Sequence, residues 1–279
     1  QKFLLGYGKH PPLSGWVAGV WFMLFPVTDW ATYALAMATL GCGLVICWLV
    51  ALRVVDRRRA FFVVVMLAIY PIFNFKGFKY NPDLLQLVTL PLMVLAYLDA
   101  LEKRSVKSGI WLGLAGALAL MTKYWVLTMI GAIGLAALIH PNRLQFLRSP
   151  APWVAIATLA VAMLPHVMWL KQVDFVPLTY AGDTYSLTDR AMIDDLALGY
   201  VKHNLALLAL PVVFGALALA WPPRRWKLFP FWSRGANSGV NISQALNVWI
   251  IQAVVAIGPP LGALIFQVYI KTDWGIPLF

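Results

Sequence analysis

The sequence is short of charge. Only 12% of its 279 residues are charged, and acidic residues are the scarcer kind, with 11 Asp and Glu against 22 Lys and Arg. Sixty-one per cent of the residues are hydrophobic, and the mean hydropathy is +0.76. So little charge on so apolar a chain excludes an ordinary soluble domain and indicates a polytopic membrane protein.

Cysteines and metal-binding patterns are scarce as well. The two cysteines, Cys42 and Cys47, lie five residues apart in one apolar segment. They face different ways on a helix, so we expect them to pack rather than to form a disulfide. No group of His, Cys and carboxylate residues has the spacing of metal ligands, and no phosphate-binding glycine loop or nucleophile elbow occurs. The sequence therefore predicts neither a metal nor another cofactor.

Long hydrophobic runs, in contrast, are plentiful. A spanning helix needs about 20 apolar residues. We predict an all-α polytopic membrane protein of about eight transmembrane helices, at 30–52, 60–73, 84–101, 106–121, 124–139, 152–170, 204–221 and 245–270. The break at Thr122-Lys123 is predicted to be a tight hairpin rather than a kink, because only a hairpin keeps every arginine-rich loop on one side. Gly258-Pro259-Pro260 is expected to kink or break the last segment.

Short juxtamembrane helices are expected on the outer side. An amphipathic stretch at 13–25 is predicted to lie along the membrane surface, and a second helix is predicted at 188–201 with Thr188 as its N-cap. We expect a single transmembrane domain over 1–279. Because the chain begins with Gln1 rather than Met, we expect a piece of a longer protein that lacks its first helix and its C-terminal part.

The basic residues show a strong bias along the chain. Thirteen of the 22 fall in every second gap, at 53–59, 102–108, 140–151 and 222–240, which the positive-inside rule places in the cytoplasm. The pI near 9.8 reflects this bias, so nucleic-acid binding is not predicted. Lysines, aspartates and aromatics fill the outer gaps, at 1–29, 74–83, 122–123, 171–203 and 271–279.

Lys9 and His10 form the first candidate site. In Gly8-Lys9-His10-Pro11-Pro12 the two prolines fix the backbone just before an apolar stretch. A rigid cationic pair at the membrane interface suits a phosphate headgroup. The alternative is an interfacial anchor whose side chains snorkel to lipid headgroups.

Residues 76–83 form the second candidate site. Lys76 and Lys79 could hold a phosphate, and Asp83 could act as a general base or orient an acceptor. Tyr80 and Asn81 are expected to contact substrate. The alternative for Asp83 is a role at the start of a helix, where the helix dipole favours a carboxylate.

Lys123 is the third candidate, since an ionisable group between two apolar runs is costly and therefore a functional candidate. Tyr124 follows it and is expected to bind substrate, whereas a lysine that snorkels at a hairpin tip is the alternative. His166, alone in an apolar helix, is expected to be a packing residue. A last group suits a sugar or a headgroup, with an interfacial Trp anchor as the alternative, and consists of Lys271, Asp273 and Trp274.

Three stretches resemble the bacterial integral-membrane glycosyltransferases that use polyprenyl-phosphate sugars, relatives of protein mannosyltransferases, of the lipid A aminoarabinose transferase and of rhizobial galacturonosyltransferases. They are Tyr7 to Trp16 (YGKHPPLSGW), Asn81 to Leu92 (NPDLLQLVTLPL) and Gly116 to Tyr124 (GALALMTKY). The resemblance implies a GT-C fold with a periplasmic active site. It places Lys9 and Lys123 at the donor phosphate and Asp83 at the family's second acidic position. The family's principal aspartate would lie upstream of Gln1.

The resemblance implies an inverting transfer of a sugar from a polyprenyl-phosphate donor to an envelope glycolipid or lipopolysaccharide acceptor in the bacterial inner membrane. The donor, the acceptor and membrane lipids are the expected partners, with other membrane protein subunits left open. Two alternatives also remain. One is a transporter or flippase of an amphiphilic anion, which also needs basic groups that face a cavity. The other is a non-catalytic structural subunit with the same fold.

Overall fold

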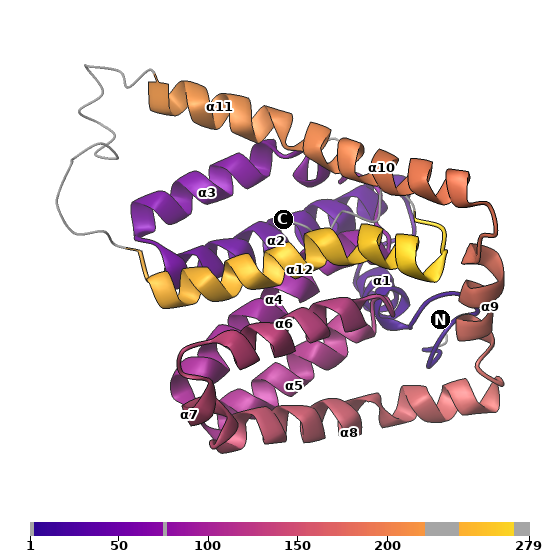
Figure 1. The fold of residues 1–279 in the computed structure, drawn as a ribbon. Coiled ribbons are helices and arrows are strands. Elements are labelled where there is room, and N and C mark those ends of the chain that lie inside the picture. The colour runs from indigo at the N-terminus through magenta and orange to yellow at the C-terminus, as the bar shows by residue number, and fades with distance from the viewer. Residues whose placement is uncertain (1–2, 75–76, 221–239, 271–279) are drawn as a thin grey trace.

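The described part of the chain is helical. The computed structural model describes residues 3–74, 77–220 and 240–270, apart from the side chains of 181–185, 218 and 219. Within these ranges no strand forms, and one isolated bridge joins Ser186 to Val268. The elements in chain order (Figure 1) are α1 (Leu13–Leu24), α2 (Asp29–Val54), α3 (Arg57–Ile69), η1 (Pro71–Phe73), α4 (Pro82–Lys103), α5 (Val106–Leu120), α6 (Val126–Ile139), α7 (Arg143–Leu147), α8 (Pro150–Gln172), α9 (Val176–Tyr185), α10 (Arg190–Leu207), α11 (Ala209–Ala220) and α12 (Ile242–Phe266).

The prediction of an all-α polytopic membrane protein is confirmed. Each of the eight predicted segments coincides with a helix or a pair of consecutive helices. Five helical stretches are long and apolar enough to cross a membrane: α2, α4, α8, α12 and the stretch from Arg190 to Leu217. Three shorter apolar helices accompany them, namely α1, α5 and α6.

The hairpin predicted at Thr122-Lys123 is also confirmed. Helix α5 ends at Leu120 and α6 begins at Val126, and the chain reverses between them so that α6 runs back beside α5 (Figure 1). The backbone amide of Leu13, at the start of α1, donates to the carbonyl of Met121 in this turn at 3.0 Å. The hairpin tip is therefore fixed to the N-terminal segment.

Two predicted boundaries are wrong. The helix expected at 188–201 begins at Arg190 and extends to Leu207, where α11 continues it almost directly (Figure 1). Its N-cap is Asp189 rather than Thr188, because the Asp189 carboxylate accepts from the backbone amides of Ala191 and Met192. This stretch is thus the first half of a long apolar helix pair and not a separate surface helix.

Of the kink or break expected at the prolines of the last segment, the break does not occur, since α12 is one helix through Pro259 and Pro260. Helix α12 packs between α6 and α10. Such neighbours allow a helix in a membrane to retain prolines whose missing amides would end an isolated helix.

Helix α4 is the centre of the packing. Two thirds of its apolar window is buried, and it contacts α2 on one side and α5 on the other. Helix α5 in turn packs closely on α8, because a Cβ on Gly113 would lie only 2.5 Å from the carbonyl oxygen of Ala155. The interior is therefore a helix bundle built around α4.

Charged residues gather at opposite ends of this bundle. At the C-terminal end of α4, Arg53 pairs with Asp99 at 2.6 Å and with Glu102 at 2.8 Å, which ties α2 to α4. Gln244 at the start of α12 donates to Glu102 at 2.7 Å. At the other end of α4, Asp83 faces the hairpin tip and the N-terminal segment. The arginine-rich loops that the structure describes, at 53–59, 102–108 and 140–151, therefore lie at the opposite end of the bundle from the candidate site.

Candidate functional site

An ion pair between Asp83 and Lys123 lies at the centre of the candidate site. Asn81 caps α4 by accepting from the amide of Leu84 at 2.8 Å, and Pro82 takes the first helical position. Asp83 follows in the first turn, where the helix dipole favours its carboxylate. Its Oδ1 lies 2.6 Å from the Nζ of Lys123, and the two side chains are 27% and 14% exposed. The pair is thus partly shielded, yet its carboxylate is accessible.

The N-terminal segment lies against this pair, and hydrogen bonds to its backbone carbonyls hold it in place. The amide of Tyr7 donates to the carbonyl of His10 at 3.0 Å, and the indole of Trp16 donates to the carbonyl of Leu4 at 2.7 Å. Gly6 is buried against Trp169, where a Cβ would lie 2.1 Å from the indole ring. This folding places His10 beside the hairpin tip, with Lys9 directly before it in the chain.

The electrostatics of His10 show how close these groups are. Burial lowers the pKa of the His10 imidazole, the charges of Lys123 and Lys9 lower it further, and Asp83 opposes them. The imidazole is therefore neutral at pH 7. It can donate one hydrogen bond and accept another, whereas Lys9 and Lys123 remain the cations of the site.

A buried chain of hydrogen bonds through His166 joins the hairpin tip to the N-terminal segment. The Nδ1 of His166 lies 2.7 Å from the carbonyl oxygen of Leu5, so this nitrogen must carry a hydrogen. The Nε2 of a neutral ring then accepts from the hydroxyl of Tyr124 at 3.1 Å. The ring also stacks on Trp169. His166 is buried and satisfied, as predicted, and it fixes the residue that follows Lys123.

The sequence did not single out Tyr180 and Gln86. Tyr180 on α9 lies over Lys9, whose Nζ is 5.7 Å from the ring centroid, a cation–π distance. Gln86 lies one turn after Asp83 on α4, is fully buried, and accepts from the indole of Trp125 at 3.3 Å. A polar residue three positions after Asp83 on the same helix was the signal that could have identified Gln86.

Among the remaining predicted site residues, two have structural roles, one is exposed, and four lie outside the described residues. The hydroxyl of Tyr80 donates to the carbonyl of Ser14 at 3.1 Å and so supports α1, and burial raises its pKa. Asn81 serves as the α4 cap, and Lys79 is exposed. The other four fall outside the described residues: Lys76, Lys271, Asp273 and Trp274. Across 3–74, 77–220 and 240–270, no three His, Cys, Asp or Glu side chains lie close enough together to hold a metal ion.

Comparison with known proteins gives two findings. Residues 9–169 match the family described as dolichyl-phosphate-mannose-protein mannosyltransferase, over more than half of the chain. A 104-residue stretch is 30% identical to the lipid A galacturonosyltransferase RgtD of Rhizobium johnstonii, over 37% of this chain and 22% of that protein. The match thus covers less than a quarter of that relative. No solved structure matches significantly.

Proposed function

Since this chain belongs to the dolichyl-phosphate-mannose-protein mannosyltransferase family, a group of GT-C glycosyltransferases, we propose that it takes part in transferring a sugar from a polyprenyl-phosphate carrier to a glycolipid acceptor. The observation that carries the proposal is the Asp83–Lys123 pair at 2.6 Å, with His10 close enough for its pKa to respond to both charges and to Lys9. The pair sets one accessible carboxylate beside one cation, and Lys9, the residue before His10, supplies a second cation to the same segment, which suits transfer away from a phosphate.

Lys9 and Lys123 bind the donor's phosphate in this proposal. Charge develops on that phosphate as its bond to the sugar breaks, so preorganised cations stabilise the transition state more than the ground state. Because Lys123 starts out paired with Asp83, an arriving phosphate competes with the carboxylate for the ammonium group. His10 contributes a neutral hydrogen bond rather than a charge. Lys76, Lys79 and Lys271 remain further phosphate contacts of the proposal, and Asp273 and Trp274 remain substrate contacts.

Asp83 orients the acceptor once Lys123 has turned to the phosphate. A lone pair of the acceptor's hydroxyl or amine forms a new bond to the anomeric carbon, from the face opposite the phosphate. The bond between that carbon and the phosphate oxygen breaks, its electron pair stays on the lipid phosphate, and the configuration inverts. The acceptor's proton passes to Asp83 as general base.

The acceptor and the orientation form part of the same proposal. The relative from Rhizobium is a lipid A galacturonosyltransferase, which supports a lipopolysaccharide-type acceptor. The arginine-rich end would lie in the cytoplasm by the positive-inside rule, so the site would face the periplasm of a bacterial inner membrane.

Release of free polyprenyl phosphate from a labelled donor lipid tests the proposal on the purified full-length protein. Lys123→Ala should weaken donor binding and abolish release, whereas Lys171→Ala should change neither. Lys171 is a suitable control because it is an exposed lysine at the C-terminal end of α8. A protein that binds donor and never cleaves it would be a carrier or a non-catalytic subunit instead. Unchanged binding in Lys123→Ala would return Lys123 to the role of an interfacial anchor.

A further inference from the structure

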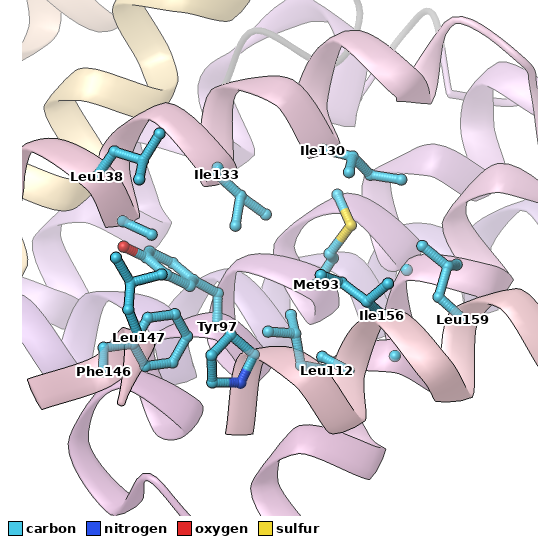
Figure 2. A pocket seen from close by; sticks show the side chains of 16 residues that line it. Met93, Tyr97, Leu112, Ile130, Ile133, Leu138, Phe146, Leu147, Ile156 and Leu159 are labelled. Carbon is cyan, nitrogen blue, oxygen red and sulfur yellow. The ribbon is translucent and has the colours of Figure 1, made fainter. Parts of the chain in front are cut away.

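An apolar groove lies between α6 and α8, away from the candidate site. Its volume is about 340 Å³. Its floor is buried, since Met93 and Tyr97 of α4 are 1% and 0% exposed. Its rims are open, since Leu138 of α6 and Ile156 of α8 are 56% and 60% exposed. Figure 2 shows Met93 and Tyr97 between the side chains of the two rims. The groove therefore opens sideways, toward the lipid that surrounds a membrane helix.

The length of the groove matches one leaflet. On α6 it extends from Ile130 to Leu138, eight residues or about 12 Å at 1.5 Å per residue. Half of the hydrocarbon core of a bilayer is about 15 Å. On α4 the groove begins at Met93, ten residues or about 15 Å beyond Asp83, and on α6 it begins at Ile130, seven residues after Lys123. Its other end, at Leu138 and Phe146, lies at the arginine-rich end of the bundle, so a lipid chain can enter from the leaflet opposite Asp83.

Basic residues border the groove at that end. Phe146 and Leu147 of α7 line the groove, and Arg143 and Arg148 flank them in the sequence. Arg143 lies three residues before Phe146, so it projects from the same side of α7. Both arginines are exposed, and neither pairs with a carboxylate among the residues the structure describes.

We propose that the groove between α6 and α8 binds one acyl chain of an anionic phospholipid from the leaflet at the arginine-rich end, with the headgroup phosphate on Arg143 and Arg148. Hydrocarbon gains little by moving from a bilayer into an apolar groove, so the groove alone selects no lipid. The headgroup supplies the selection, because each basic residue near a membrane surface strengthens anionic-lipid binding by about fivefold. This site is independent of the proposed glycosyl transfer.

Two glycines on α6 provide a matched pair of variants. Gly134 lines the groove, Gly131 does not, and a Cβ on either would meet no atom within 4 Å. Gly134→Phe therefore adds a ring at the groove from a Cβ that meets no other atom, and Gly131→Phe adds the same side chain to the same helix at a position that does not line the groove. A second pair of variants tests whether the two arginines bind the lipid headgroup. Arg143→Gln/Arg148→Gln removes the two arginines at the groove, and Arg57→Gln/Arg59→Gln removes two arginines from α3.

The experiment is native mass spectrometry of the delipidated full-length protein, titrated with dioleoyl phosphatidylglycerol or dioleoyl phosphatidylcholine. Phosphatidylglycerol should bind about 25-fold more tightly than phosphatidylcholine. Gly134→Phe should lose this binding by at least tenfold while Gly131→Phe keeps it. Arg143→Gln/Arg148→Gln should remove the preference while Arg57→Gln/Arg59→Gln retains it.

Three results would overturn the proposal. Equal affinities for the two lipids would show that the arginines select no headgroup. Unchanged phosphatidylglycerol binding in Gly134→Phe would place the lipid elsewhere. Displacement of phosphatidylglycerol by polyprenyl phosphate, lost in Gly134→Phe, would make the groove a site for the donor's tail. If Gly134→Phe does not fold, the two double arginine variants still test the proposal, because they measure the preference for phosphatidylglycerol over phosphatidylcholine.

Discussion

Replacing Asp83 by Asn should separate donor binding from transfer. The Asp83–Lys123 pair is 2.6 Å long, and its side chains are 27% and 14% exposed. Fully exposed pairs contribute about 0–1 kcal/mol, and removing one partner of a fully buried pair costs about 3–5 kcal/mol. A partly shielded pair falls between these limits, at about 2 kcal/mol, which corresponds to about 30-fold in an equilibrium constant.

The sign of the effect on the donor follows from competition. Since a phosphate must take Lys123 from Asp83, Asp83→Asn frees the lysine and removes a like charge. We expect Asp83→Asn to bind the donor lipid up to about 30-fold more tightly, and to lose about 10²- to 10⁴-fold in transfer because the general base is gone. Lys123→Ala should weaken donor binding instead.

The assay is a donor-lipid titration at low and at high salt, beside single-turnover release of polyprenyl phosphate. Asp189→Asn is the matched control, because Asp189 is another carboxylate at a helix N-terminus and Asn caps a helix equally well. It should change neither quantity. The reasoning is refuted if Asp83→Asn weakens donor binding as much as Lys123→Ala does, since Asp83 would then hold Lys123 in place rather than compete for it.

Three further perturbations have expected outcomes. Gly113→Ala should lower the free energy of unfolding by about 1–3 kcal/mol, because its Cβ would meet the α8 backbone at 2.5 Å. Gly41→Ala, whose Cβ would meet no atom within 4 Å, should not destabilise the protein. Thermal unfolding in detergent measures both variants. Folding lowers the pKa of His10 from 6.5, so the unfolded chain binds more protons than the folded chain below that pH. The free energy of unfolding should therefore fall as the pH drops below about 6.5, and His10→Gln should flatten this dependence. An equally steep pH dependence in both proteins would contradict the prediction. Tyr180→Leu removes the ring over Lys9 and should speed amide hydrogen exchange in α9 by about two- to fivefold, from the 0.5–1 kcal/mol of an exposed cation–π contact, while Tyr180→Phe should not.

Much of the fold follows from local chemistry in the sequence. Long apolar runs predicted the helices, because a backbone in lipid must satisfy its hydrogen bonds within the segment. The hairpin at Lys123 followed from the arginine bias, since only a hairpin keeps every arginine-rich loop on one side. Local chemistry left open whether the last segment would kink or break at Pro259 and Pro260, because packing against neighbouring helices decides that, and α12 continues through both prolines.

The candidate site was predictable in its parts but not as an assembly. Lys9, Asp83 and Lys123 were each singled out for a local reason: the two prolines that fix the backbone after Lys9 and His10, the cluster of charged residues around Asp83, and the cost of an ionisable group between two apolar runs at Lys123. No spacing could show that Asp83 and Lys123, 40 residues apart, form one ion pair. Nor could it show that His10 stays neutral, because that depends on burial and on two lysines brought beside it by folding.

The sequence by itself thus determined the class of molecule, the positions of its helices and the residue types at each end of the bundle. Those properties depend on the hydrophobicity and charge of neighbouring residues along one chain. Only the tertiary structure decided which charges pair, which histidine is held between Leu5 and Tyr124, and where α6 and α8 leave a groove over α4. Such contacts join segments far apart in the sequence, so they depend on how the helices pack.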